Sequence, residues 1–97
     1  MDHYQWNPEK NEQLKAERGL CFEQIVMHIE GNDLLAVYEH PNQVRYPGQQ
    51  ILVVRIGDYA YLVPFMETAE GRFLKTIVPS RKATRQDLGD KDEDSQT

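Results

Sequence analysis

The 97-residue chain lacks the residues from which most disulfide and metal sites are built. Its single cysteine, Cys21, excludes an internal disulfide, and its three scattered histidines show no HxxxH spacing and lie near no CxxC motif. No apolar run approaches the ~18 residues of a membrane span, and the polar first ten residues lack the apolar segment of a secretion signal. The sequence therefore predicts a cytoplasmic protein with no metal, no cofactor and no membrane contact, in which Cys21 is a core residue rather than a nucleophile.

Acidic residues are absent from residues 71–85, although the whole chain carries a net charge of −5. Residues 86–97 contain five acids and one lysine, so most of the acidity belongs to this tail. We expect residues 1–88 to form one domain and residues 89–97, which are polar and densely charged, to be disordered. The segment without acids contains five cations, which are Arg72, Lys75, Arg81, Lys82 and Arg85.

Two helices are predicted near the N-terminus, after a short aromatic segment at residues 3–6 that could form a first strand. Asn7-Pro8-Glu9 has the features of a helix start and Gly19 those of a helix end, so residues 8–18 should be helical. From Phe22, apolar residues recur at i, i+3, i+4 and i+7, which indicates a second, amphipathic helix that ends at Gly31.

The middle of the chain is rich in β-branched, aromatic and aliphatic residues, which predicts four strands joined by turns. Gly57-Asp58 is a two-residue hairpin turn, and Pro64 cannot donate to a ladder, which predicts a bulge or an unpaired edge there. We therefore expect an α+β fold in which two N-terminal helices pack on an antiparallel β-meander of about four strands, followed by a short helix from residue 80 to about 88. The expected strands are residues 34–39, 50–56, 59–65 and 72–78.

Three of the cations fall at the start of this predicted C-terminal helix. A helix N-terminus carries partial positive charge and unpaired N–H groups, so Arg81, Lys82 and Arg85 oppose the helix dipole unless an anion is bound. Arg81 and Arg85 are four residues apart, share one helix face and could clamp one phosphate. This pattern favours a nucleic acid as partner. The alternatives are an acidic protein, or a solvated surface helix paired with Glu67 or Glu70.

Two segments resemble the BrnT family of toxins. Residues 6–10, WNPEK, are similar to the family's Trp-Asp-Pro-x-Lys, and residues 80–85, SRKATR, match its Ala-Arg-Lys-Ala-Thr-Arg with Ser in place of Ala. The resemblance spans residues 6–87 and implies a fold similar to that of RelE-type ribonucleases. It also implies the toxin half of a bacterial toxin–antitoxin module, RNA cleavage without the ribosome and a DNA-binding antitoxin as partner. The chain departs from the family at residues 17–19, where Glu-Arg-Gly replaces Lys-His-Gly.

The resemblance also implies roles for individual residues. Metal-independent RNA cleavage needs a base, an acid and cations around the transition state. Lys10 and the three cations of residues 81–85 carry over from the family's motifs, whereas Arg18 and Lys75 match it in charge alone. The expected roles are transition-state stabilisation by Arg81 and Arg85, and contacts with RNA phosphates by Lys10, Lys75 and Lys82.

The sequence offers one candidate for proton transfer and two aromatic candidates for contacts with RNA bases. His40 follows a predicted strand and is a residue type suited to proton transfer near neutral pH, although a surface histidine is the alternative. Tyr59 and Tyr61 share one side of a strand and would either stack on bases or pack within the sheet. Two functions stay open: an endoribonuclease toxin, or a non-catalytic interaction module whose basic helix binds an acidic protein partner. A homodimer is compatible with both.

Overall fold

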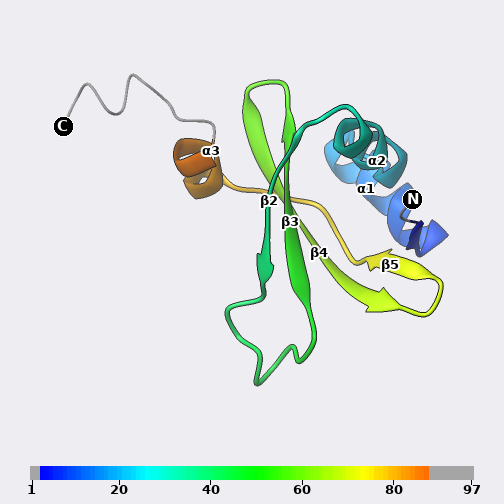
Figure 1. The fold of residues 1–97 in the computed structure, drawn as a ribbon. Coiled ribbons are helices and arrows are strands. Elements are labelled where there is room, and N and C mark those ends of the chain that lie inside the picture. Colours follow the sequence, from blue (N-terminus) through cyan, green and yellow to red (C-terminus); the bar gives the residue numbers. More distant parts are fainter. Residues whose placement is uncertain (1–2, 88–97) are drawn as a thin grey trace.

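A mixed six-stranded sheet separates two helices from a third (Figure 1). The computed structural model describes residues 3–87, so the tail of residues 89–97, predicted to be disordered, lies outside the described residues. Helices α1 (Pro8–Arg18) and α2 (Phe22–Glu30) lie on one side of the sheet, and α3 (Arg81–Asp87) lies on the other. The predicted α+β class is therefore confirmed. None of the helices within residues 3–87 is long and apolar enough to cross a membrane.

The two N-terminal helices begin and end as predicted. Asn7 caps α1, since its side-chain oxygen accepts hydrogen bonds from the backbone N–H of Glu9 and of Lys10 at 2.8 and 3.2 Å, and the left-handed Gly19 ends it. Helix α2 also ends where expected, but the left-handed residue after it is Asn32, with a φ of 71°, rather than Gly31.

The start of α2 is capped from a different helix. Cys21 occupies the N-cap position but makes no side-chain capping bond. Instead the buried side chain of Asn11, in α1, accepts a hydrogen bond from the Phe22 backbone N–H at 2.7 Å and donates one to Glu23 Oε1 at 2.8 Å. Asn11 thus satisfies a first-turn N–H group of α2 and joins the two helices.

Four strands form the predicted antiparallel meander. They are β2 (Leu34–Glu39), β3 (Gln50–Ile56), β4 (Tyr59–Thr68) and β5 (Gly71–Leu74). The possible first strand at residues 3–6 is present as β1 (Tyr4–Trp6), which pairs parallel with β5, and a further strand, β6 (Val78–Pro79), pairs with β4. The prediction of an antiparallel meander of about four strands is therefore wrong in strand count and in sheet type. The parallel pair is possible because the helices and the meander supply the long connection that parallel strands require.

The predicted strand of residues 72–78 is interrupted opposite Pro64. Leu74 pairs with Phe65 and Val78 pairs with Leu62, so this segment advances four residues while β4 advances three. The Pro64 carbonyl accepts a hydrogen bond from the Lys75 N–H at 2.7 Å. The backbone N and C=O of one strand residue point toward the same neighbouring strand. The Pro64 nitrogen, which carries no hydrogen, therefore also faces the interrupted segment, where a regular ladder would need a donor. The prediction of a bulge or an unpaired edge at Pro64 is confirmed only in part: the ladder on this side of β4 is interrupted, but the extra residue lies in the partner segment, and β4 itself keeps a regular register with β3.

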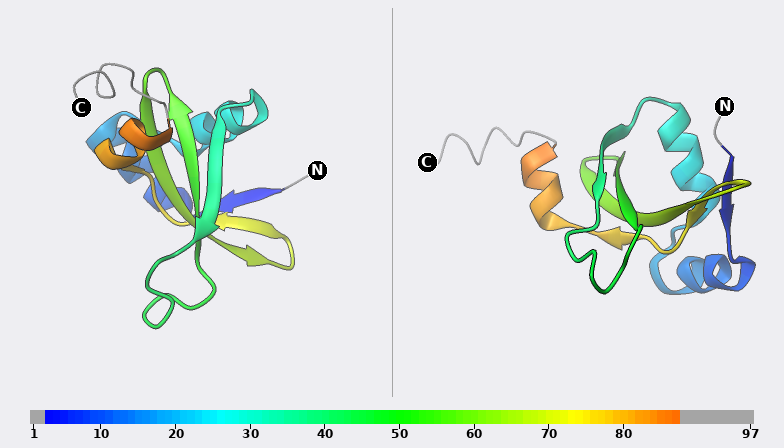
Figure 2. Two further views of the ribbon diagram at one scale, coloured as in Figure 1. Left: turned by 60° about the vertical axis from the view of Figure 1, so that its left-hand side comes forward. Right: turned by 60° about the horizontal axis from the view of Figure 1, so that its bottom comes forward.

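The sheet is buried on both faces, because the side chains of β3 alternate between two apolar clusters. Figure 2 shows β1 and α3 at opposite sides of the molecule and the connection between β2 and β3 extending beyond the sheet. We call the side covered by α1 and α2 the helix-pair face, and the other side the α3 face. The helix-pair cluster consists of Leu14, Phe22, Ile25, Leu52, Val54, Val63, Phe65, Leu74 and Ile77. The α3 cluster is smaller and is built on Val53, Ala60 and Ala83.

Candidate nucleic-acid interface

Three residues of the segment 80–85 attach α3 to the sheet. The Ser80 hydroxyl oxygen accepts a hydrogen bond from the Ala83 N–H at 3.1 Å and so caps the helix. Ala83 is 6% exposed and packs against Val53 and Ala60, where its small side chain lets the helix approach the strands. The Thr84 hydroxyl donates to the Ser80 carbonyl at 2.8 Å and accepts from the Ala60 N–H at 2.8 Å.

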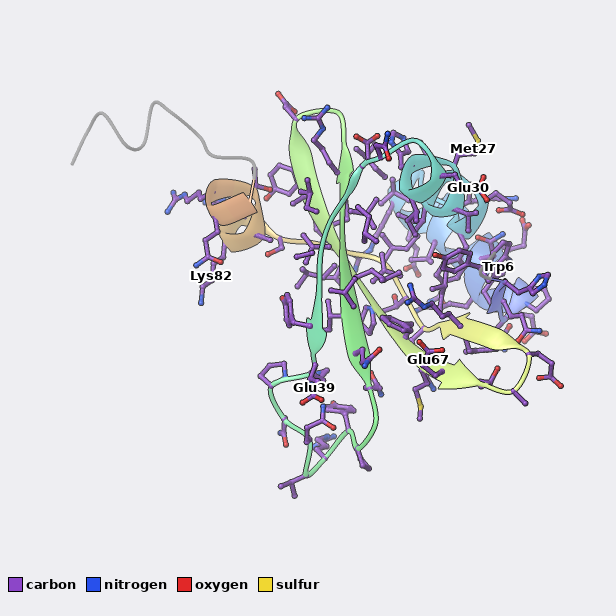
Figure 3. All side chains as sticks on the ribbon, viewed as in Figure 1. Trp6, Met27, Glu30, Glu39, Glu67 and Lys82 are labelled. Atoms are coloured by element: carbon purple, nitrogen blue, oxygen red, sulfur yellow. The ribbon has the colours of Figure 1, made fainter. Side chains whose placement is uncertain are left out.

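The other three residues of the segment are cations whose side chains are exposed: Arg81, Lys82 and Arg85. In Figure 3, Lys82 projects from α3 on the side of the sheet away from Trp6 and Met27. Glu67, one of the two acids expected to pair with these cations, instead pairs with Arg72, whose Nε lies 3.3 Å from Glu67 Oε2. Arg81 and Lys82 take part in no ion pair within residues 3–87. Arg81 and Lys82 therefore present positive charge to solvent on the α3 face.

A cleft of about 430 Å³ lies on the α3 face, and Lys82 is the one of these three cations that lines it. Its floor is formed by β2 and β4 and includes Tyr38, whose side chain remains 44% exposed. One wall belongs to α3, and Pro41 adds the start of the loop that follows β2. The cleft thus combines an aromatic surface, an apolar floor and a lysine ammonium group. Its lining residues are Ala36, Tyr38, Pro41, Leu62, Ser80, Lys82, Ala83 and Gln86.

His40 lies next in the chain to Pro41 and is held in a defined orientation. Its N–H donates to the Gln49 carbonyl at 2.9 Å, which extends the β2–β3 ladder by one residue. Its ring Nδ1 accepts a hydrogen bond from the Asn42 N–H at 3.0 Å, and the ring centroid lies 4.5 Å from that of Tyr46. Because Nδ1 is an acceptor, the neutral ring carries its proton on Nε2, which is therefore a hydrogen-bond donor in this orientation.

The remaining predicted phosphate ligands are not gathered around α3. Lys10 belongs to α1, on the opposite side of the sheet. Lys75 is exposed in the interruption between β5 and β6, and its Nζ lies 5.7 Å from the Phe73 ring centroid. Arg18, the charge-equivalent residue in the first helix, donates to the Ile77 carbonyl at 3.2 Å and supports the same interruption.

The aromatic residue of the cleft is one that sequence reasoning missed. Tyr59 and Tyr61, the predicted candidates for base stacking, contact each other edge-on at 5.7 Å, and Tyr61 packs against the helix-pair cluster. Tyr38 lies on the α3 face instead. The alternation of residues 34–39 places Tyr38 on the side opposite Val37, but the sequence does not indicate that α3 covers that side.

The chain matches no protein-family model, no curated protein and no solved structure. The chemistry of this interface is therefore inferred from its own residues. Residues 3–87 contain no group of three or more His, Cys, Asp or Glu side chains arranged to hold a metal ion. The cleft offers cation, hydroxyl, amide and aromatic groups, which bind phosphate and flat π surfaces.

Proposed function

We propose that this chain is the toxin component of a bacterial toxin–antitoxin system and acts on RNA through α3 and the adjacent cleft. The observation that carries the proposal is the division of residues 80–85 into three that fix α3 on the sheet and three exposed cations. Those residues are also the ones that resemble the BrnT motif. The order of two helices, an antiparallel meander and a final helix agrees with the RelE-like fold that the resemblance implies.

The proposed reaction is metal-independent cleavage of the RNA backbone. The RNA 2′-oxygen attacks phosphorus while a base removes its proton, and an acid protonates the 5′-oxygen as its bond to phosphorus breaks, which leaves a cyclic phosphate and a 5′-hydroxyl. Arg81 and Arg85 would stabilise the charge that develops on the phosphate oxygens, and Lys82 would hold a neighbouring phosphate. His40 is the proposed proton carrier, because it directly precedes Pro41 of the cleft. To accept or donate a proton in the reaction, its ring must give up the hydrogen bond that Nδ1 accepts from the Asn42 N–H.

Expression in a bacterial host tests this proposal. Induction of the wild type should arrest growth and deplete RNA, whereas Arg81→Ala combined with Arg85→Ala should do neither at equal protein level. The pair Arg81→Lys and Arg85→Lys keeps the charge but loses the planar guanidinium fork, so it should restore RNA binding better than RNA cleavage. Lys15→Ala is the matched control, because this exposed lysine lies on α1 and pairs with Glu12 at 3.1 Å. Equal growth of the wild type and the Arg-to-Ala double variant would contradict the proposal.

A non-catalytic interaction module is the second candidate, and the composition of the cleft favours it. The eight lining residues include no carboxylate and no imidazole, and four of them are apolar. Such a cleft suits a protein segment that places an apolar side chain on Ala36 and Leu62 and a carboxylate near Lys82. In this function the DNA-binding antitoxin, or another acidic protein, is the partner and RNA is not cleaved.

Purified protein separates the two functions. A nuclease toxin should cleave RNA in the presence of a metal chelator and should lose this activity in the His40→Ala variant or the Arg81→Ala and Arg85→Ala variant. An interaction module should leave RNA intact and bind an acidic partner, with an affinity that falls in the same arginine variant. The gene beside this one gives an independent check, since a short neighbour that encodes a DNA-binding protein supports the toxin–antitoxin pair.

A further inference from the structure

The loop of residues 40–49 is held in shape by polar side chains rather than by an apolar core. The Gln43 amide makes three hydrogen bonds across it: Nε2 donates to the His40 and Gln49 carbonyls at 2.8 and 3.0 Å, and Oε1 accepts from the Gly48 N–H at 3.0 Å. A single side chain thereby fixes both ends of the loop.

Asn42 orders the tip of the same loop. Its side-chain oxygen accepts from the Arg45 N–H at 3.0 Å, and its carbonyl accepts from the Tyr46 N–H at 2.9 Å. The apolar residue at the tip, Val44, is 96% exposed, so it contributes almost no burial. Ordering a loop costs conformational entropy, and burial at the tip offsets little of that cost here. A fixed shape without a core is typical of loops that present functional groups.

The groups presented by this loop form a short stack. The Tyr46 ring lies 4.5 Å from the His40 ring at a tilt of 42°, and the Arg45 guanidinium carbon lies 5.5 Å from the Tyr46 ring centroid. Residues 40–49 contain an arginine and a histidine and no acidic residue. Pro41, which follows His40, lines the cleft together with Lys82 of α3, so the start of the loop and this lysine border one surface.

We propose that the stack of His40, Tyr46 and Arg45 is a nucleobase-binding site for single-stranded RNA whose phosphates are held by α3. This rests on the proposed function and adds a base contact to it. An unpaired base stacks on an aromatic ring or a guanidinium plane, and such contacts tolerate any base. An acidic peptide would use the cations but not the ring faces, so the aromatic part of the stack favours RNA over a peptide.

Binding of an RNA oligomer and of an abasic oligomer of the same length tests the site, since the two carry the same phosphates. The full-length wild type should bind the RNA at least about fivefold more tightly than the abasic oligomer. Tyr46→Leu should bring the ratio of the two affinities, RNA over abasic oligomer, close to one without changing the affinity for the abasic oligomer. Tyr46→Phe keeps the ring and should retain the ratio, and Val44→Ala is the matched control in the same loop. Arg45→Gln, at an exposed position, should lower the ratio without disturbing the fold, which thermal unfolding of each variant verifies.

The outcomes separate this site from the function on which it rests. A wild type that binds both oligomers equally, or a ratio that survives in both Tyr46→Leu and Arg45→Gln, overturns the nucleobase site but leaves phosphate binding by α3 intact. Loss of affinity for both oligomers in the Arg81→Ala and Arg85→Ala variant supports that phosphate contact independently. A wild type that binds neither oligomer at low salt overturns the base site and the RNA function together.

Discussion

The hydroxyl oxygen of Thr84 accepts a hydrogen bond from the backbone N–H of Ala60 at 2.8 Å. The carbonyl of the same Ala60 accepts from the Ser80 N–H at 3.1 Å. The first turn of α3 therefore satisfies both backbone polar groups of a strand residue, as a neighbouring strand would. This relationship fixes the helix that carries the three exposed cations.

Replacing Thr84 with valine should destabilise the protein, because valine has the same shape but leaves the Ala60 N–H without this partner. We expect Thr84→Val to lower the free energy of unfolding by about 1–3 kcal/mol, and Thr84→Ser, which keeps the hydroxyl, to lower it by less. Urea unfolding of the three proteins measures the difference. Equal stability of the valine and serine variants would show that the bond to Ala60 contributes nothing.

Asn11→Ala should destabilise the pair of N-terminal helices. Asn11 is 4% exposed, and its side chain supplies the bond to the Phe22 N–H that Cys21 does not make. Loss of this cap and of the bond to Glu23 should cost about 2 kcal/mol in the free energy of unfolding, again measured in urea. Gln13→Ala, on the exposed side of the same helix, should change stability by less than about 0.5 kcal/mol. Similar losses in both variants would contradict the capping role.

Stability should fall in acid, in part because of Glu23. The hydrogen bond from the Asn11 amide, followed by the Glu23 backbone N–H, holds the pKa of this carboxyl below its usual value of 4.5. A carboxyl whose pKa is lower in the folded state stabilises the protein fully above its unfolded pKa, and this contribution disappears as the pH falls through the folded pKa. Unfolding in urea between about pH 6 and about pH 3 should show a smaller acid-dependent loss in Asn11→Ala than in the wild type. Identical pH profiles would exclude the link.

Removing residues 89–97 should speed association with RNA. This segment contains four acids and one lysine, and it follows closely on the cations of α3 in the chain. When the negative charge of this segment is removed, the rate of association with RNA should rise by on the order of tenfold at low salt. The gain should shrink at higher salt, which screens the repulsion between the segment and the RNA phosphates. Stopped-flow fluorescence measures the rate. A full-length control with its four acids replaced by Asn or Gln should match the truncation; an unchanged rate in both would contradict the prediction.

The elements set by neighbouring residues could be predicted from the sequence. Asn7 and Gly19 define α1, and the Gly57-Asp58 turn gives the hairpin between β3 and β4. Pro64 indicates where the ladder on one side of β4 is interrupted, because the missing donor is a property of that residue alone.

Features that depend on distant segments could not be predicted. The parallel pairing of β1 with β5 joins residues that lie 68 positions apart, such as Tyr4 and Arg72, and nothing in either segment specifies the partner. The side of the sheet that α3 covers depends on the interruption between β5 and β6. The sequence therefore predicts neither the cleft nor the position of Tyr38 in its lining. The position of three exposed cations on one short helix could be predicted because their spacing is local, whereas Lys10 lies across the sheet from them.

The interruption opposite Pro64 also decides which face of the sheet the chain presents after it. Side chains alternate between the two faces along a strand, so residues 74 and 78 of an uninterrupted strand would lie on the same face. Here Leu74 lies on the helix-pair face with Phe65, whereas Val78 pairs with Leu62 of the α3 face. The one extra residue between these pairs thus reverses the alternation just before the chain enters the basic helix.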